Sequence, residues 1–219
     1  MKRAVFAACV VALAIGVPTA LGKPSSSVSM GVAPRTLTLG SSTTIAGHAS
    51  GSKAPGAAVF LQAKPFGSSS YTNVGNTTAN SSGNYIFHYF PTRNTLVRVV
   101  AKAAPQATSP SVFVGVRMRV GLSVGTLHPK KGQMVRVSGI VVPAFNGSVV
   151  QLHRRTATGH WRTMALATLF GTTANSFGPR SEYFRRLKIN RSGTWRVRFI
   201  PPIDGWLANN SRTRTLIVH

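Results

Sequence analysis

Two stretches of this chain repeat the same β-hairpin pattern, and the repeat constrains the fold more than any other feature of the sequence. The first stretch runs from Gly56 to Thr78 and the second from Gly147 to Leu169. In the second, an apolar-rich strand is followed by a turn over 156–159 and by a return strand that begins at Trp161. Apolar strands joined by a Gly-containing turn are typical of a β-hairpin. A hairpin that occurs twice predicts a duplicated β architecture.

Further segments recur at a nearly constant spacing along the chain. The matched segments are 45–47 and 137–139, 56–61 and 147–152, Tyr71 and Trp161, 85–87 and 183–185, and 97–99 and 195–197. The spacing rises from 90 to 98 residues between the third and fourth pairs. This rise predicts an insertion in the second copy near 171–180, where Gly and Pro indicate an enlarged loop.

The pattern favours an all-β fold. No window outside the N-terminal segment has a helical period. Two copies of about 95 residues, each with roughly seven short strands, predict two tandem immunoglobulin-like β-sandwich domains over residues 23–117 and 118–219. The stretch 112–120 between them is strand-like and lacks a Gly/Ser or Pro linker. We therefore expect a short, stiff junction and an elongated rod.

Several short motifs carry a family resemblance. The pattern Gly56-x-x-Val59, then 82–85 (SGNY), then 97–99 (VRV) resembles the tandem Ig-like and carboxypeptidase-regulatory-like repeats of secreted bacterial proteins. The resemblance covers essentially the whole chain after residue 22 and implies a surface or secreted module without an active site. An acid usually precedes Ser-Gly in such repeats. Ser81 and Arg191 occupy those positions here, so the resemblance implies no loop-bound metal.

Residues 1–22 have the pattern of a signal peptide. A positive start at Lys2 and Arg3 precedes an apolar stretch over 4–17 and small residues at Ala20 and Gly22. We predict cleavage after Gly22 and export to the cell envelope or the medium. An uncleaved N-terminal anchor is the alternative. The single cysteine lies in the apolar stretch, so the exported chain would have no disulfide.

The charge of the chain is strongly one-sided. Its 26 Lys and Arg face two acids, which gives a formal net charge of +24. Sixteen of the cations lie in residues 118–219. In the expected strand at 194–199, Trp195, Val197 and Phe199 alternate with two arginines, so the arginines should face outward.

Arginines on three expected strands of the second copy should share one sheet. We predict that the outer face of this sheet binds polyanions through Arg154, Arg155, Arg196, Arg198, Arg212 and Arg214. The expected partner is an anionic polysaccharide of the envelope surface or another polyanion, nucleic acid included. The alternative to polyanion binding is that the basic face is only solvated, or that the arginines reflect a bias in amino-acid composition. Two charges ~7 Å apart repel by only about 0.6 kcal/mol in water, which a fold tolerates.

A tryptophan in the loop 201–209 suggests a second binding mode. Trp206 lies there beside Asp204 and Asn209, and these three residues could bind a sugar ring in a carbohydrate-binding accessory module. The alternative is a structural role, with Trp206 folded back over the end of the sandwich.

Catalytic patterns are weak. Glu182 and Asp204 are the only acids and lie far apart in the sequence, whereas glycoside hydrolysis needs two neighbouring carboxylates. No nucleophile elbow accompanies the histidines, and His153 with His160 would make a metal site without a carboxylate or thiol. We predict a non-enzymatic protein with no metal, cofactor or small-molecule substrate; a hydrolase with an unrecognised site is the alternative.

Overall fold

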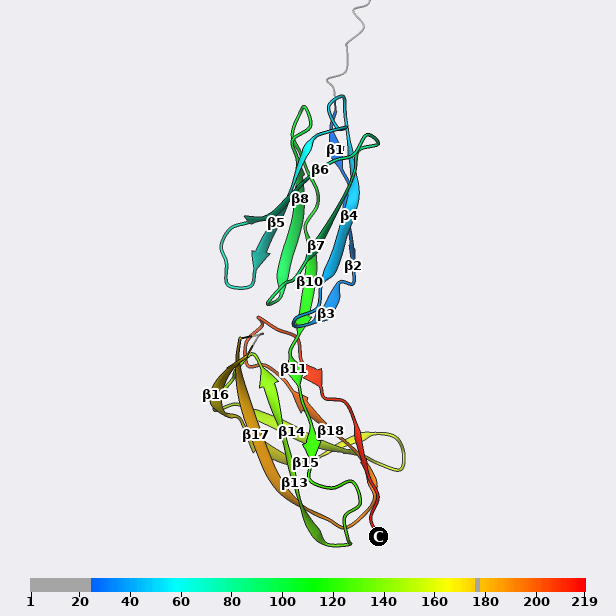
Figure 1. The fold of residues 1–219 in the computed structure, drawn as a ribbon, viewed down its shortest axis with the longest axis vertical. Helices are drawn as coiled ribbons and strands as arrows, with labels where there is room; N and C mark the ends of the chain where they lie inside the picture. The colour runs from blue at the N-terminus through cyan, green and yellow to red at the C-terminus, as the bar shows by residue number, and fades with distance from the viewer. Residues whose placement is uncertain (1–24, 176–177) are drawn as a thin grey trace, which may run out of the picture.

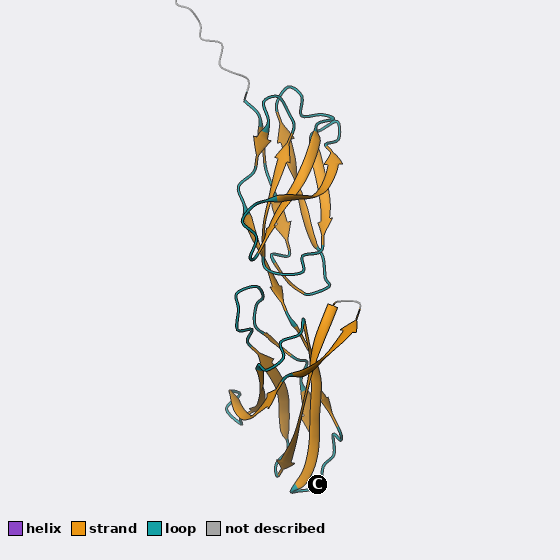
Figure 2. Cartoon of the chain, turned by 90° about the vertical axis from the view of Figure 1, so that its left-hand side faces the viewer, coloured by secondary structure: helices purple, strands orange, loops and turns teal. Residues whose placement is uncertain are grey.

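The computed structural model describes residues 25–175 and 178–219 (Figure 1). Every regular element in this part of the chain is a β-strand, which confirms the predicted all-β class (Figure 2). No membrane-spanning helix occurs among the described residues. The predicted signal peptide at 1–22 lies outside them.

The strands of residues 27–117, the N-terminal sheet pair, form two sheets. The first contains β1 (Ser27–Val28), β2 (Gly31–Ala33), β4 (Thr43–Ser50) and β7 (Asn84–Tyr89), with β4 at its centre. The second contains β3 (Thr36–Thr38), β5 (Ala58–Pro65), β6 (Thr72–Thr78), β8 (Thr95–Ala101), β9 (Ala107–Thr108) and β10 (Val112–Arg117). Its order is β3-β10-β8-β5-β6, with β9 beside β8 and a parallel pairing of β10 with β3.

The strands of residues 119–216, the C-terminal sheet pair, form two more. One has the order β11-β13-β17-β16, with β12 beside β13. Its members are β11 (Arg119–Val120), β12 (Ser123–Val124), β13 (Gln133–Val142), β16 (Phe170–Asn175) and β17 (Gly178–Ile189). The other has the order β15-β14-β18-β19, with β20 beside β18. Its members are β14 (Val149–Arg155), β15 (Trp161–Thr168), β18 (Gly193–Phe199), β19 (Asn209–Asn210) and β20 (Arg214–Leu216).

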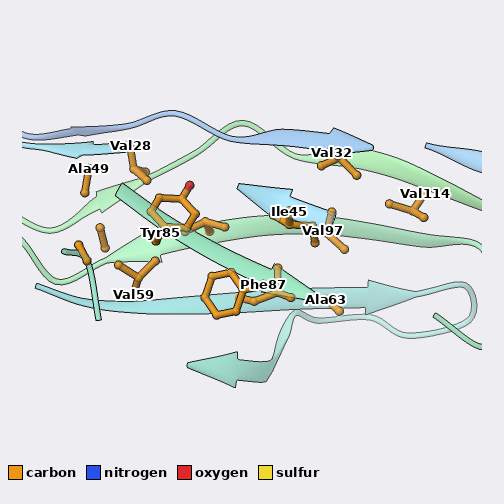
Figure 3. Close-up of a cluster of buried hydrophobic side chains, with 14 of the residues drawn as sticks. Val28, Val32, Ile45, Ala49, Val59, Ala63, Tyr85, Phe87, Val97 and Val114 are labelled. Carbon is orange, nitrogen blue, oxygen red and sulfur yellow. The ribbon is translucent and has the colours of Figure 1, made fainter. Parts of the chain in front are cut away.

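Each sheet pair encloses apolar side chains from both of its sheets. In the N-terminal pair, Ile45 and Phe87 of one sheet meet Val59 and Val97 of the other (Figure 3). In the C-terminal pair, Tyr183 of one sheet shares a cluster with side chains of the other, including the buried Val197 and Phe199. Burial of these alternate positions supplies the main stabilising free energy of such layers, at about 25 cal/mol for each Å² of apolar surface.

A tyrosine–glycine contact appears in both sheet pairs at equivalent positions. The hydroxyl of Tyr85 donates a hydrogen bond to the carbonyl of Ser29, and the hydroxyl of Tyr183 donates one to the carbonyl of Gly121 at 2.6 Å. A Cβ atom on Gly47 or Gly139 would collide with the corresponding tyrosine and carbonyl. Glycine is therefore required at both places, 92 residues apart, and the repeat seen in the sequence is a repeat of structure.

The repeated hairpins also share an irregularity. Pairing of β5 with β6 shifts between Leu61 and Gln62, which leaves Val74 without a partner on β5. Pairing of β14 with β15 shifts between Leu152 and His153 and leaves out Met164 in the same way. Such a bulge bends a strand and increases its twist. The two bulges lie 90 residues apart, so the two hairpins have one geometry with different side chains.

The insertion in the second copy is not the enlarged loop that the sequence predicts. Its residues form β16 and the start of β17, paired from Phe170 opposite Glu182 to Asn175 opposite Gly178. Glycine and proline suggested a loop, but Gly178 lies at the start of the returning strand with a positive φ of 99°, which suits a tight hairpin end.

The two sheet pairs follow one another along the long axis of the molecule (Figure 1). Met118 alone separates β10 from β11, and it is fully buried. The loop between β18 and β19 returns to this junction, where Leu207 donates a backbone hydrogen bond to Val116 at 2.8 Å. Backbone pairing across the junction ties the two sheet pairs together.

Candidate functional site

Two predicted arginines share the outer face of the β14–β18 sheet. Strand pairing places Arg196 opposite His153 and Arg198 opposite Gln151. Directly opposed residues in an antiparallel pair lie on the same face, and the intervening Val197 is buried, so both arginines point away from the core. None of the five strands of this sheet contains Asp or Glu.

The other predicted arginines do not complete a single row. Arg154 and Arg214 each pair opposite Trp195, so they lie on the core side of the sheet plane, near its end. The stem of Arg154 covers Gly193, where a Cβ would lie 3.1 Å from its Cδ. The prediction that all three strands present arginines outward is therefore wrong for these two. Neighbouring residues of a strand face opposite sides, so Arg154, which shares its face with the buried Leu152, could not point outward together with Arg155. The face of Arg214 depends on the register of β20 with β18, which sequence alone does not determine.

The remaining two arginines are exposed at the margins of this sheet. Arg155 ends β14 on the same face as His153 and donates from Nε to the carbonyl of Gly159 at 3.2 Å. Arg212 precedes β20 and is exposed. We call Arg155, Arg196 and Arg198 the basic face.

An aromatic ring fixes the position of the central arginine. The guanidinium carbon of Arg196 lies 4.1 Å from the ring centroid of Trp161 on β15. The equivalent pair in the N-terminal sheet pair, Arg98 and Tyr71, has the same distance of 4.1 Å. A cation–π contact of this kind is worth about 0.5–1 kcal/mol at an exposed site and restricts the arginine side chain. Sequence reasoning matched Tyr71 to Trp161 but did not find their contacts with arginine.

A buried histidine lies between the arginines. His153 is only 5% exposed, and its Nε2 lies 3.2 Å from Oε1 of Gln151. Burial lowers the pKa of His153, and the positive charges of Arg196 and Arg198 lower it further. The imidazole is therefore neutral near pH 7, and the arginines supply the charge of this face.

The predicted sugar-binding residues lie at the junction between the sheet pairs. Trp206 Nε1 donates to the carbonyl of Thr92 at 2.8 Å, and the indole packs against the cores of both sheet pairs. Phe145 meets its ring edge-on at 5.5 Å, and the Arg93 guanidinium lies 5.2 Å from its centroid. The indole thus joins the two halves, as the structural alternative for Trp206 expects.

The two neighbours of Trp206 have separate surroundings. Asn209 donates from Nδ2 to the carbonyl of Met118 at 2.7 Å. Asp204 borders a pocket of about 520 Å³, which Trp206 also lines and Asn209 does not. Most of the pocket wall is apolar and comes from the N-terminal sheet pair, including the exposed Phe66 and Phe113. Sequence reasoning missed these two residues because nothing in their own stretches indicates a neighbour 90 or more residues away.

The two acids of the chain lie in different places. Glu182 is 3.4 Å from Arg180 in an exposed ion pair, and Asp204 is in the junction loop. Across residues 25–175 and 178–219, no three His, Cys, Asp or Glu side chains gather closely enough to hold a metal ion. No protein-family model and no curated protein matches this chain.

Proposed function

We propose that this protein is an exported, non-catalytic binding or structural module of the cell envelope, built from two tandem Ig-like β-sandwiches, that contacts anionic polymers through the basic face. The four-sheet arrangement, the repeated tyrosine–glycine contact and the repeated bulge support the tandem Ig-like interpretation. The charged and apolar pattern of residues 1–22 supports export. Mass spectrometry of the protein recovered outside the cells tests both export and cleavage after Gly22.

The observation that carries the proposal is an acid-free sheet with two outward arginines on one strand. Arg196 and Arg198 are two residues apart, which separates their Cα atoms by about 7 Å. Successive phosphates along one strand of DNA are spaced similarly, and sulfated or phosphorylated glycans offer comparable charges. Arginine pairs with such groups through two parallel hydrogen bonds. The Trp161 ring already restricts the side chain of Arg196, which reduces the conformational entropy lost on binding.

Salt dependence separates this proposal from a merely solvated face. We expect retention on immobilised heparin, with elution at lower salt for the double variant Arg196→Gln, Arg198→Gln. If each arginine neutralises one anionic group, the slope of log affinity against log salt should fall by about 2. The matched control is Arg154→Gln, Arg214→Gln, which removes the same charge from positions opposite Trp195.

The control makes the outcome decisive. Equal elution of the two double variants would mean that net charge alone governs retention, and the assignment to this face would be rejected. Comparison of heparin, double-stranded DNA and a neutral dextran distinguishes glycan from nucleic-acid preference.

The junction pocket is the one observation that favours the second candidate, a carbohydrate-binding module. Trp206 and Asp204 both line it. Binding of a neutral glycan that persists in 1 M salt and is lost in Phe113→Ala would support this function. Phe113 is a better probe than Trp206, because it is half exposed and its removal leaves the Trp206–Thr92 hydrogen bond in place.

A further inference from the structure

Two strand edges of the C-terminal sheet pair have no strand partner among the described residues. β15 pairs with β14 only. β17 pairs with β16 only as far as Glu182, so its edge from Tyr183 to Ile189 is open on the side away from β13. An open edge offers unpaired backbone N–H and C=O groups to an added strand.

A groove of about 520 Å³ lies where these edges adjoin. It is lined by Leu166, Ala167, Thr168, Phe170, Phe184, Arg185 and Arg186. Leu166, Phe170 and Phe184 are between 44% and 52% exposed, and Phe170 meets Phe184 edge-on at 5.7 Å. Large apolar side chains left exposed together indicate an interaction site.

The charge around the groove is positive. Arg185 and Arg186 line it, and the Arg136 guanidinium lies 5.0 Å from the Phe184 ring centroid. The nearby Glu182 is paired with Arg180. A partner that fills this groove must therefore bring carboxylates as well as apolar side chains.

The N-terminal sheet pair provides an internal comparison, because its hairpin has the same bulge. Leu166 corresponds to Asn76 at a spacing of 90 residues, and Arg185 and Arg186 correspond to Phe87 and His88 at a spacing of 98. Phe170 lies in the inserted strand β16, which the N-terminal sheet pair lacks. Phe184 corresponds to Ile86, which is exposed as well, so an apolar side chain recurs at that place in both copies. Leu166, Phe170 and the two arginines have no such counterpart and are specific to the second copy.

We infer that the groove between β15 and β17 binds an extended acidic peptide segment with apolar residues, which adds as a strand to the open edge of β17. The seven residues of this edge span about 23 Å at 3.3 Å each, the length of a seven- or eight-residue segment. Backbone pairing would supply affinity, and contacts with Leu166, Phe184 and the two arginines would supply selectivity. This surface differs from the basic face, so the inference does not depend on the proposed function.

The test uses the purified full chain and an eight-residue peptide of alternating Glu and Leu. Nuclear magnetic resonance should show peptide-dependent shifts and slowed amide exchange at 183–189. A peptide with N-methyl groups on alternate residues keeps the side chains but cannot pair along one edge, and we expect it to bind at least ten-fold more weakly. Replacement of Glu by Lys in the peptide should abolish binding.

Three variants locate the contact. Leu166→Asn copies the residue of the first repeat, and a second variant combines Arg185→Gln with Arg186→Gln. Each should weaken peptide binding about five-fold, because these side chains line the groove. All three are exposed, so both variants should keep the fold. Arg196→Gln with Arg198→Gln should leave peptide affinity unchanged. Equal binding of the N-methylated peptide, or a loss confined to the Arg196, Arg198 variant, would overturn the inference.

Discussion

Asn94 is one of the residues that hydrogen-bond across the junction of the two sheet pairs, and its replacement by alanine should destabilise the protein strongly. Its Oδ1 accepts a hydrogen bond from the backbone N–H of Val116 at 2.8 Å, and its Nδ2 donates to the carbonyl of Asp204 at 2.6 Å. The backbone N–H of Asn94 also donates to Gly205 at 2.8 Å, a bond that survives the substitution. Asn94 is buried and Val116 is fully buried, so the substitution leaves the Val116 N–H without a protein partner in the interior.

The magnitude follows from these contacts. Loss of a hydrogen bond costs about 1 kcal/mol, and a buried donor left without a partner costs about 1–3 kcal/mol. We therefore expect Asn94→Ala to lower the free energy of unfolding by about 3 kcal/mol. That is a large fraction of the 5–15 kcal/mol typical of a folded domain.

Urea unfolding followed by tryptophan fluorescence measures this loss, since Trp206 reports on the same junction. The control is Asn73→Ala, which removes an exposed amide bonded to Gln62 at 3.0 Å and should cost less than about 0.5 kcal/mol. If Asn94→Ala were as stable as this control, the side-chain hydrogen bonds of Asn94 would not stabilise the junction, and the reasoning would fail.

Two further predictions concern pH. Burial raises the pKa of Tyr85 from 10.0 to about 12, so the folded state keeps a proton that the unfolded state loses above pH 10. The free energy of unfolding should thus fall as pH rises from 10 to 12. In paired urea titrations the free energy of unfolding of Tyr85→Phe should fall less over this range. Equal pH dependence of the two proteins would contradict the assignment of this effect to Tyr85. His153 has the opposite dependence, because burial and the two neighbouring arginines lower its pKa. The unfolded imidazole takes up a proton near its usual pKa of about 6.5, while the folded one does so only at lower pH. Stability should decrease as pH falls below about 6.5, and thermal unfolding of His153→Gln should show a weaker decrease; an unchanged profile would mean that another group titrates.

Some features of the basic face can be predicted from the sequence because they depend on local alternation. Trp195, Val197 and Phe199 recur with the strand period of two, and this period predicts that Arg196 and Arg198 face outward, as they do in the structure. The second hairpin was also correctly placed, because its turn at 156–159 is defined by residues in contact along the chain. Side-chain direction within one strand is a local property.

The all-β class, the position of the repeat and the excess of positive charge can be predicted from the amino-acid sequence, since composition and short-range periodicity encode all three. Which residues become neighbours across strands and across the junction follows from the three-dimensional fold. Arg214 pairs opposite Trp195 rather than beside Arg196, and Trp206 donates to Thr92, which lies 114 residues earlier. Register and junction contacts arise from packing between distant segments, and many pairings are compatible with the same local pattern.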